Sequence, residues 1–375
     1  MVLFSSMLVV VAIINFFVDP GTVYFKKVSR SSLISLYTDT LASSQYGMRQ
    51  EGWNERDVKL ELAKRTGEIE CIILGSSHVM SISIHNIEGL KKTCGSVMNL
   101  GVSGFSIEDL AIFTGILLKS TNIVENKKVI IGIDPWTLNF NRDFRYTPYI
   151  DSYYNLTKKV GFTIDNDEEA KDSKYNTELF SNLISFDYFN ESLSLIKKDG
   201  FRSMLSQVYD SINIYKERKA YVYSQVVPKF SISNGWEVAV TLPDGGHVNS
   251  SKYVAEAARK KHPLDAQKYK IIEGEWFDNN AIDLFSRIVL SLKKYNFEVI
   301  ILITPYHPNI WHKSSGEVSR KAMHLVFERL SALTHQLDIK LLGSYQPQVV
   351  GCDSDEFFDF MHARSTCLNK IWQDE

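Results

Sequence analysis

The residue types best suited to chemistry in this 375-residue chain are a serine, a histidine and an aspartate. Ser77 lies in the run 75–78 (GSSH), directly after a short apolar segment, and Asp359 precedes His362 by three positions. Acyl transfer through serine needs a hydroxyl, a base that takes its proton and a carboxylate that orients the base. One short turn can present Asp359 and His362 to a common site. The pattern therefore predicts a catalytic triad of Ser77, His362 and Asp359.

A tetrahedral intermediate also needs hydrogen-bond donors for its negative oxygen. The run 99–104 (NLGVSG) ends just ahead of a helix that we expect to begin at Ser106. A backbone N–H at that point benefits from the positive end of the helix dipole, and two glycines and a serine suit a turn that binds an anion. Gly104 is therefore the candidate oxyanion donor.

Elements that could position these residues follow from apolar patterning. Short apolar runs predict strands that are buried on both faces of a parallel sheet, and helical patterns alternate with them as in βαβ units. Ligands bind outside the carboxyl ends of such strands, which is where all the candidate residues fall. The predicted strands are 70–74, 97–100, 128–133, 298–304 and 339–342, and the predicted helices are 106–118, 279–295 and 316–337.

The amino terminus is the most apolar part of the chain. Residues 1–18 carry no charged side chain, and as a helix they would span about 27 Å before the stop at Asp19-Pro20-Gly21. We expect a membrane anchor. A buried core helix is one alternative, and a cleaved signal peptide is another, although a basic n-region and a small-residue cleavage site are missing. The basic residues Lys26, Lys27 and Arg30 follow the segment, so its orientation stays open.

We divide the chain into an anchor at 1–18, a juxtamembrane segment at 19–68, an α/β core at 69–139, a long insertion or subdomain at 140–275, and a second core part at 276–375. Lys and Arg number 42 and Asp and Glu 44, a net charge of -2 that removes the electrostatic case for nucleic-acid binding. The four cysteines form no CxxC pair, which argues against structural zinc. Cys352 and Cys367 could form a disulfide in an oxidising compartment, and the sequence leaves this pairing undecided.

The order of these motifs resembles that of the SGNH/GDSL hydrolase superfamily. Run 75–78 is similar to its nucleophile block, run 99–104 to its second block, and Asp359-x-x-His362 to its last block. The resemblance implies a flavodoxin-like three-layer α/β/α sandwich with a parallel sheet. It also implies a serine esterase or acyltransferase site without cofactor or metal, in which Ser77 and Gly104 provide the oxyanion hole.

The third block departs from the superfamily, which has Gly-x-Asn-Asp where this chain has Gly132-Ile-Asp134-Pro135. A carboxylate accepts hydrogen bonds and donates one only when it is protonated. Asp134 is therefore a candidate for substrate support, or for oxyanion support in its protonated form. His307 or Asn139 could replace the missing donor. Together with the anchor, this departure resembles membrane-anchored SGNH-like proteins of bacterial envelope polysaccharide assembly, relatives of alginate O-acetylation and D-alanyl-lipoteichoic-acid biosynthesis proteins. The resemblance covers about residues 1–140 and 276–375.

The resemblance implies a membrane-anchored acyltransferase or esterase that acts on O-acyl groups, above all acetyl groups, of an envelope or extracellular polysaccharide. Its partners would be an acyl donor, the glycan and a membrane-bound O-acyltransferase, and its body would be periplasmic or extracellular. One alternative is a non-catalytic assembly or scaffold protein that retains the fold. Another is a metal-dependent enzyme built on His78, His307, His362 and Asp359, although no His-x-x-x-His pair supports it. The sequence does not decide whether the acyl group passes to water, as in an esterase, or to a sugar hydroxyl, as in an acyltransferase.

Overall fold

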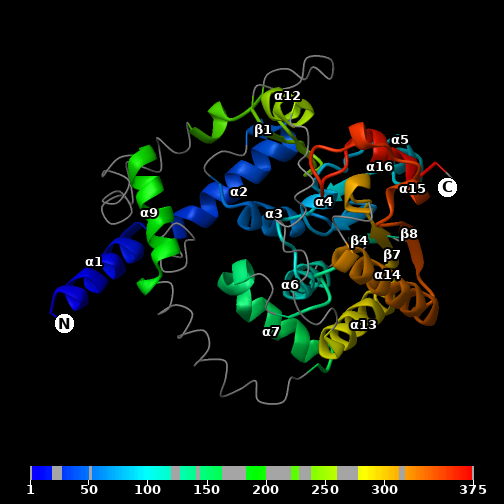
Figure 1. Cartoon of the computed structure of the whole chain (residues 1–375), viewed down its shortest axis with the longest axis horizontal. Helices are drawn as coiled ribbons and strands as arrows, with labels where there is room; N and C mark the ends of the chain where they lie inside the picture. Colours follow the sequence, from blue (N-terminus) through cyan, green and yellow to red (C-terminus); the bar gives the residue numbers. More distant parts are fainter. Residues whose placement is uncertain are drawn as a thin grey trace. The chain divides into compact units, whose positions relative to one another are not determined.

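A computed structural model defines the fold (Figure 1), and the part of the chain that it describes falls into two compact units. One unit comprises residues 1–37 and 163–224, and the other comprises residues 38–162 and 225–375. The described residues are 2–18, 28–49, 53–119, 127–140, 144–162, 183–199, 221–227, 238–259, 278–311 and 317–373.

A five-stranded parallel sheet forms the centre of the second unit, with strand order β3-β2-β4-β7-β8. Buried Val, Ile and Leu side chains dominate the strands, as is typical of parallel sheets that are covered on both faces. All five strands fall where the apolar runs predict them, so the mixed α/β class with a parallel sheet is confirmed. The strands are β2 (Cys71–Leu74), β3 (Val97–Asn99), β4 (Lys128–Gly132), β7 (Glu298–Ile303) and β8 (Lys340–Gly343).

Helices flank this sheet. Helix α6 begins at the predicted place, because Ser106 and Asp109 form a reciprocal capping box at its start. Helix α13 buries a stripe of residues three or four positions apart, which is the pattern of an amphipathic helix on a core. The helices of this unit are α3 (Glu55–Ala63), α4 (Ser77–Met80), α5 (Glu88–Thr93), α6 (Ile107–Leu117), α7 (Ile150–Lys159), α12 (Ser251–Arg259), α13 (Asn279–Lys294), α14 (Glu317–Leu337), α15 (Pro347–Val350) and α16 (Ser365–Lys370). Short 3₁₀ helices cover Phe144–Tyr149, Pro308–Trp311 and Ser354–Glu356.

A small antiparallel sheet adjoins the end of β3. It consists of β1 (Met48–Arg49), β5 (Val240–Thr241) and β6 (His247–Val248), with a tight turn between the last two. Gly245 in this turn has φ +77°, and a Cβ there would lie 2.2 Å from the carbonyl oxygen of Asn99. Only glycine permits this approach. Residues 238–250, which belong to the predicted insertion, are thus fitted to the strand end that leads into the 99–104 loop.

The first unit contains α1 (Val2–Val18), α9 (Phe186–Asp199) and most of α2 (Val28–Ser43). Asn15 of α1 is buried, and its side-chain amide donates to the carbonyls of Leu183 and Ser185, while Ser192 donates to its oxygen. Within the described residues, no helix is both long and apolar enough to cross a membrane. The predicted span over 1–18 is therefore not found. The stop at 19–21 and the residues Lys26 and Lys27 lie outside the described part.

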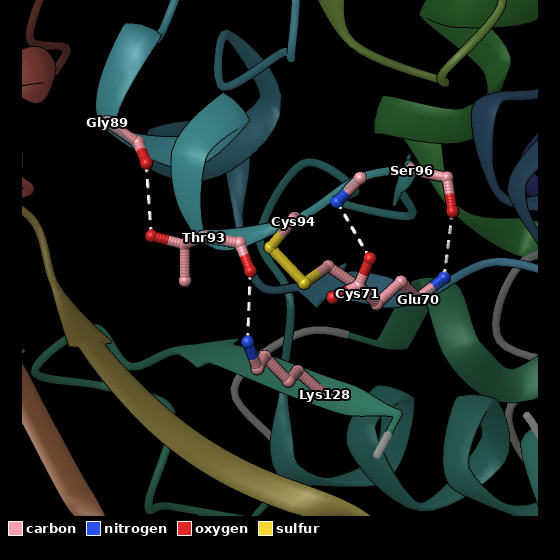
Figure 2. The surroundings of a disulfide bond; sticks show 8 residues. Glu70, Cys71, Gly89, Thr93, Cys94, Ser96 and Lys128 are labelled. Carbon is pink, nitrogen blue, oxygen red and sulfur yellow. Dashed lines mark hydrogen bonds between the residues drawn. A yellow bond between two sulfur atoms is a disulfide. The ribbon is translucent and has the colours of Figure 1, made fainter. Parts of the chain in front are cut away.

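Two disulfides fasten the second unit. Cys71 at the start of β2 bonds to Cys94 after α5 (Figure 2). Cys352 bonds to Cys367 of α16, which is the pairing that the sequence analysis left undecided. Beside the first bridge, Cys71 N–H donates to the carbonyl of Ser96 at 2.9 Å. Lys128 Nζ donates to the carbonyl of Thr93 at 2.9 Å (Figure 2). The bridge ties the start of β2 to the end of α5, and the hydrogen bond from Lys128 connects this corner to the start of β4.

We predict that the double variant Cys71→Ala/Cys94→Ala loses about 3 kcal/mol of unfolding free energy, because the bridge closes a loop of 23 residues in the unfolded chain. Urea unfolding followed by circular dichroism measures the change. The matched variant Cys352→Ala/Cys367→Ala, which opens a similar loop of 15 residues, should lose a comparable amount. An unchanged unfolding midpoint in the first variant would contradict the assigned role of the bridge.

Candidate active site

Ser77 is held at the carboxyl edge of the sheet by the turn from β2 into α4. Gly75 has φ +149°, and a Cβ there would lie 2.9 Å from Val79 and 3.1 Å from the backbone of Gly132 in β4. Ser76 then caps α4, because its Oγ accepts from the N–H of His78 at 3.2 Å. The close packing and the cap fix Ser77 as the first residue of the helix.

Asp359 and His362 are presented by a tight turn, as their spacing predicts. The Oδ1 atom of Asp359 accepts from the backbone N–H groups of Met361 at 2.7 Å and His362 at 2.9 Å. Phe358 N–H donates to the carbonyl of His362 at 2.8 Å and closes the turn. An aspartate that binds the backbone two and three residues further on is typical of such turns.

These three side chains form a continuous hydrogen-bonded chain. The Ser77 Oγ lies 2.8 Å from His362 Nε2, and His362 Nδ1 lies 2.8 Å from Asp359 Oδ2. The carboxylate selects the tautomer with hydrogen on Nδ1, so that Nε2 is free to accept the serine proton. The side chains of His362 and Asp359 are 30% and 22% exposed, which leaves the group within reach of solvent. The arrangement can thus generate a serine nucleophile.

The protonation state of Asp359 suits this role. Burial alone would raise its pKa, but the hydrogen bond and charge of His362, together with the N–H groups of Met361 and His362, outweigh burial and hold the pKa well below its usual range. Asp359 is therefore a carboxylate at neutral pH. It can accept the Nδ1–H of His362 and stabilise the imidazolium that forms during proton transfer.

The 99–104 loop offers a backbone donor beside the nucleophile turn. Gly101 N–H donates to Asn99 Oδ1 at 2.8 Å, Val102 N–H to the carbonyl of Gly75 at 2.9 Å, and Ser103 N–H to Glu55. The next N–H, that of Gly104 at φ +61°, has no partner among the described residues. The N–H of Ser77 likewise meets no acceptor in the described part of the chain. Oxyanion donors of a free enzyme need to be open in this way.

Asp134 lies in a buried group beside the triad. Its Oδ1 lies 3.4 Å from His78 Nδ1 and 3.4 Å from the hydroxyl of Tyr306, and Thr304 Oγ1 lies 3.3 Å from the same His78 nitrogen. The His78 ring in turn lies 5.0 Å from the ring of His362. Asp134 is 2% exposed. From this buried position Asp134 orients the ring of His78.

His307 and Asn139, the other candidates for oxyanion support, have contacts of their own. His307 is buried, its Nδ1 accepts from Asn309 N–H at 3.1 Å, and its ring packs on Phe357 and Phe360. It therefore supports the loop that carries the triad. The N–H of Asn139 donates to the carbonyl of Trp136 in a turn.

The metal alternative finds no support in the structure. Over the described residues, no three His, Cys, Asp or Glu side chains are grouped so that they could hold a metal ion. His78 and His362 lie close together, but His78 Nδ1 faces Asp134 and Thr304, and both nitrogens of His362 face the other members of the triad.

Sequence reasoning missed residues that approach the site from distant segments. Tyr253 of α12 places its hydroxyl 3.4 Å from Asp359 Oδ2, and its ring lies 6.0 Å from that of Phe358. Three ionic residues of α3 contact the 99–104 loop. Segment 140–275 carries no local pattern that could reveal Tyr253. For helix α3, the capping residue Asn54 is a local signal from which the start of the helix could be predicted.

Comparison with known proteins gives no family for the chain. No protein-family model matches it, and no curated protein matches it with significance. The functional argument therefore depends on the site.

We predict a pH dependence of stability that depends on His78. The pKa of His78 is lowered to about 4, mainly by burial. The charge of Asp134 opposes this shift, His362 adds to it, and Asp359 opposes it. Because an unfolded histidine has a pKa of about 6.5, the unfolded state binds the proton first. The stability contribution of neutral His78 is therefore complete above about pH 6.5 and is lost as the pH falls to about 4.

Urea unfolding of wild type and His78→Gln between about pH 7.5 and about pH 4.5 measures this contribution. We expect the wild type to lose stability more steeply over that interval than the variant does. Parallel pH profiles of the two proteins would show that His78 is not held neutral by its surroundings.

Proposed function

We propose that this protein is a serine-dependent O-acyl esterase or acyltransferase of the SGNH type. The observation that carries the proposal is the chain from Ser77 Oγ through His362 to Asp359, at 2.8 Å in each of its two steps. It lies at the carboxyl edge of a parallel sheet, which is where sites of open α/β folds occur. Two backbone N–H groups without a partner in the described residues, those of Ser77 and Gly104, supply the donors that the reaction needs.

The strand order supports a flavodoxin-like sandwich. Numbered along the chain, the five parallel strands β2, β3, β4, β7 and β8 lie in the order 2-1-3-4-5, which is that of flavodoxin-like sheets. With the motif order noted in the sequence, this arrangement favours the SGNH superfamily over other folds that carry a serine triad.

In the proposed reaction, Ser77 Oγ attacks the carbonyl carbon of an ester while His362 Nε2 takes the serine proton. The carbonyl oxygen becomes an oxyanion and accepts from the N–H groups of Ser77 and Gly104. When the tetrahedral intermediate collapses, the bond to the leaving oxygen breaks and His362 returns the proton to that oxygen. An acyl-serine remains. Water or a sugar hydroxyl, deprotonated by His362, then attacks the acyl carbon, and Ser77 is regenerated as its oxygen takes back the proton.

We infer that the substrates are O-acyl, above all O-acetyl, groups of an envelope or extracellular polysaccharide. The resemblance to SGNH-like proteins of polysaccharide assembly supports this class. The two disulfides support a body in an oxidising compartment, periplasmic or extracellular, because such bridges are rare where thiols stay reduced. In such a setting a membrane-bound O-acyltransferase is a fitting source of acyl groups.

We predict that a fluorophosphonate labels the wild-type protein covalently and that Ser77→Ala abolishes the labelling. His362→Ala should slow labelling by at least about 10³-fold, because the serine loses its base. Gel fluorescence and mass spectrometry measure the adduct. Ser43→Ala, which removes an exposed hydroxyl that donates to carbonyls of its own helix, should be labelled like wild type.

Two results would contradict the proposal. Labelling that persists in Ser77→Ala would place the reactive group elsewhere. A correctly folded wild type that resists the probe would favour the alternative, a non-catalytic scaffold that retains the fold.

A further inference from the structure

Helix α3 directs three ionic side chains at the 99–104 loop, and we name Glu55, Arg56 and Lys59 the α3 clamp. Glu55 accepts from the N–H of Ser103 at 2.5 Å and from its hydroxyl at 3.2 Å. Arg56 Nη2 donates to the carbonyl of Ser103 at 3.0 Å. Lys59 Nζ donates to the carbonyl of Asn99 at 2.9 Å and to that of Gly245 at 2.5 Å. The clamp thus binds both ends of the loop.

Arg56 also holds the chain beyond Gly104. Its Nε and Nη2 donate to the two carboxylate oxygens of Asp109 at 3.0 and 2.9 Å, which is the bidentate geometry that fixes an orientation. Asp109 is the residue that closes the capping box with Ser106 at the start of α6. One guanidinium therefore ties Ser103, directly before Gly104, to the helix start directly after it.

Three of these groups are buried, and Glu55 is half-buried. Arg56, Lys59 and Asp109 are 4%, 2% and 1% exposed. Buried ion pairs often contribute no more to stability than apolar side chains of the same size, because the charges lose their hydration. Desolvation is visible at Lys59, whose pKa burial lowers to about 8 against the opposing charges of Glu55 and Asp244. What such a network does supply is a fixed geometry for the backbone it binds.

We propose that the α3 clamp positions the Gly104 N–H as an oxyanion donor. None of its members touches the reacting atoms, so Glu55, Arg56 and Lys59 are positioning residues. The superfamily that the sequence resembles has a side-chain amide where this chain has Asp134, so more of the stabilisation falls to the backbone donors. The remaining backbone donor must then be held to a fraction of an ångström, since small displacements of catalytic groups cost large factors in rate. This inference rests on the proposed acyl-transfer function.

A merely structural role of the clamp would change stability alone, and Lys127 provides the matched control. Like Lys59, it is buried and donates to two backbone carbonyls, those of Thr66 and Gly67. It precedes β4, however, and so lies at the amino edge of the sheet, away from the triad.

The test is the steady-state hydrolysis of p-nitrophenyl acetate. We expect Lys59→Met to lower kcat by about 10- to 100-fold with little change in KM, because the Gly104 N–H that Lys59 positions stabilises the transition state rather than the bound substrate. Lys127→Met should keep kcat within about twofold of wild type and lose only thermal stability. Glu55→Ala should lower kcat by about 10-fold, whereas Glu55→Gln, whose amide oxygen still accepts from Ser103 N–H, should restore most of it.

Circular dichroism checks that each variant folds. If Lys59→Met does not fold, the comparison of Glu55→Ala with Glu55→Gln decides whether the clamp positions the donor. Wild-type kcat in both Lys59→Met and Glu55→Ala, with hydrolysis abolished in Ser77→Ala, would overturn the clamp and leave the proposed function standing. An equal fall of kcat in Lys127→Met would also overturn it. A wild type that neither hydrolyses the ester nor reacts with a fluorophosphonate would overturn both.

Discussion

Val79 packs against two glycines, and this contact decides where the nucleophile lies. A Cβ on Gly132 would come within 2.4 Å of Val79 Cγ1, and one on Gly75 within 2.9 Å of Val79 Cγ2. Helix α4 can therefore rest directly on the ends of β2 and β4 only because both positions lack side chains. This packing of Val79 on Gly75 and Gly132 places Ser77 at the edge of the sheet where the loops after the other parallel strands converge. The triad and the oxyanion loop both depend on it.

The charged and titratable groups around this contact differ in how deeply they are buried. The deeper groups, which include Asp134 with His78 and Arg56 with Asp109, are almost fully buried and are paired with one another or with the backbone. The triad lies at the margin of this network, where His362 and Asp359 remain partly exposed. Rigid polar support below an accessible reactive group is the arrangement that pre-organised catalysis requires.

The sequence predicts those features that depend on local pattern. Apolar runs located the five strands, and the Asp359-x-x-His362 spacing located a turn that does bring both side chains to Ser77. Contacts between distant segments leave no such pattern, which is why the α3 clamp, Tyr253 and the Cys71–Cys94 bridge were missed. The apolar composition of residues 1–18 predicted a membrane span, but the described helix α1 has 17 residues and contains a buried, hydrogen-bonded Asn15.

A crystal structure of the protein after reaction with a fluorophosphonate tests the central claim most directly. The account predicts phosphorus bonded to Ser77 Oγ, with the phosphoryl oxygen within hydrogen-bond distance of the N–H groups of both Ser77 and Gly104, and His362 still bound to Asp359. An adduct on any other residue would contradict the assignment of the nucleophile. An adduct on Ser77 whose phosphoryl oxygen faces away from Gly104 would contradict the oxyanion site and, with it, the purpose assigned to the α3 clamp.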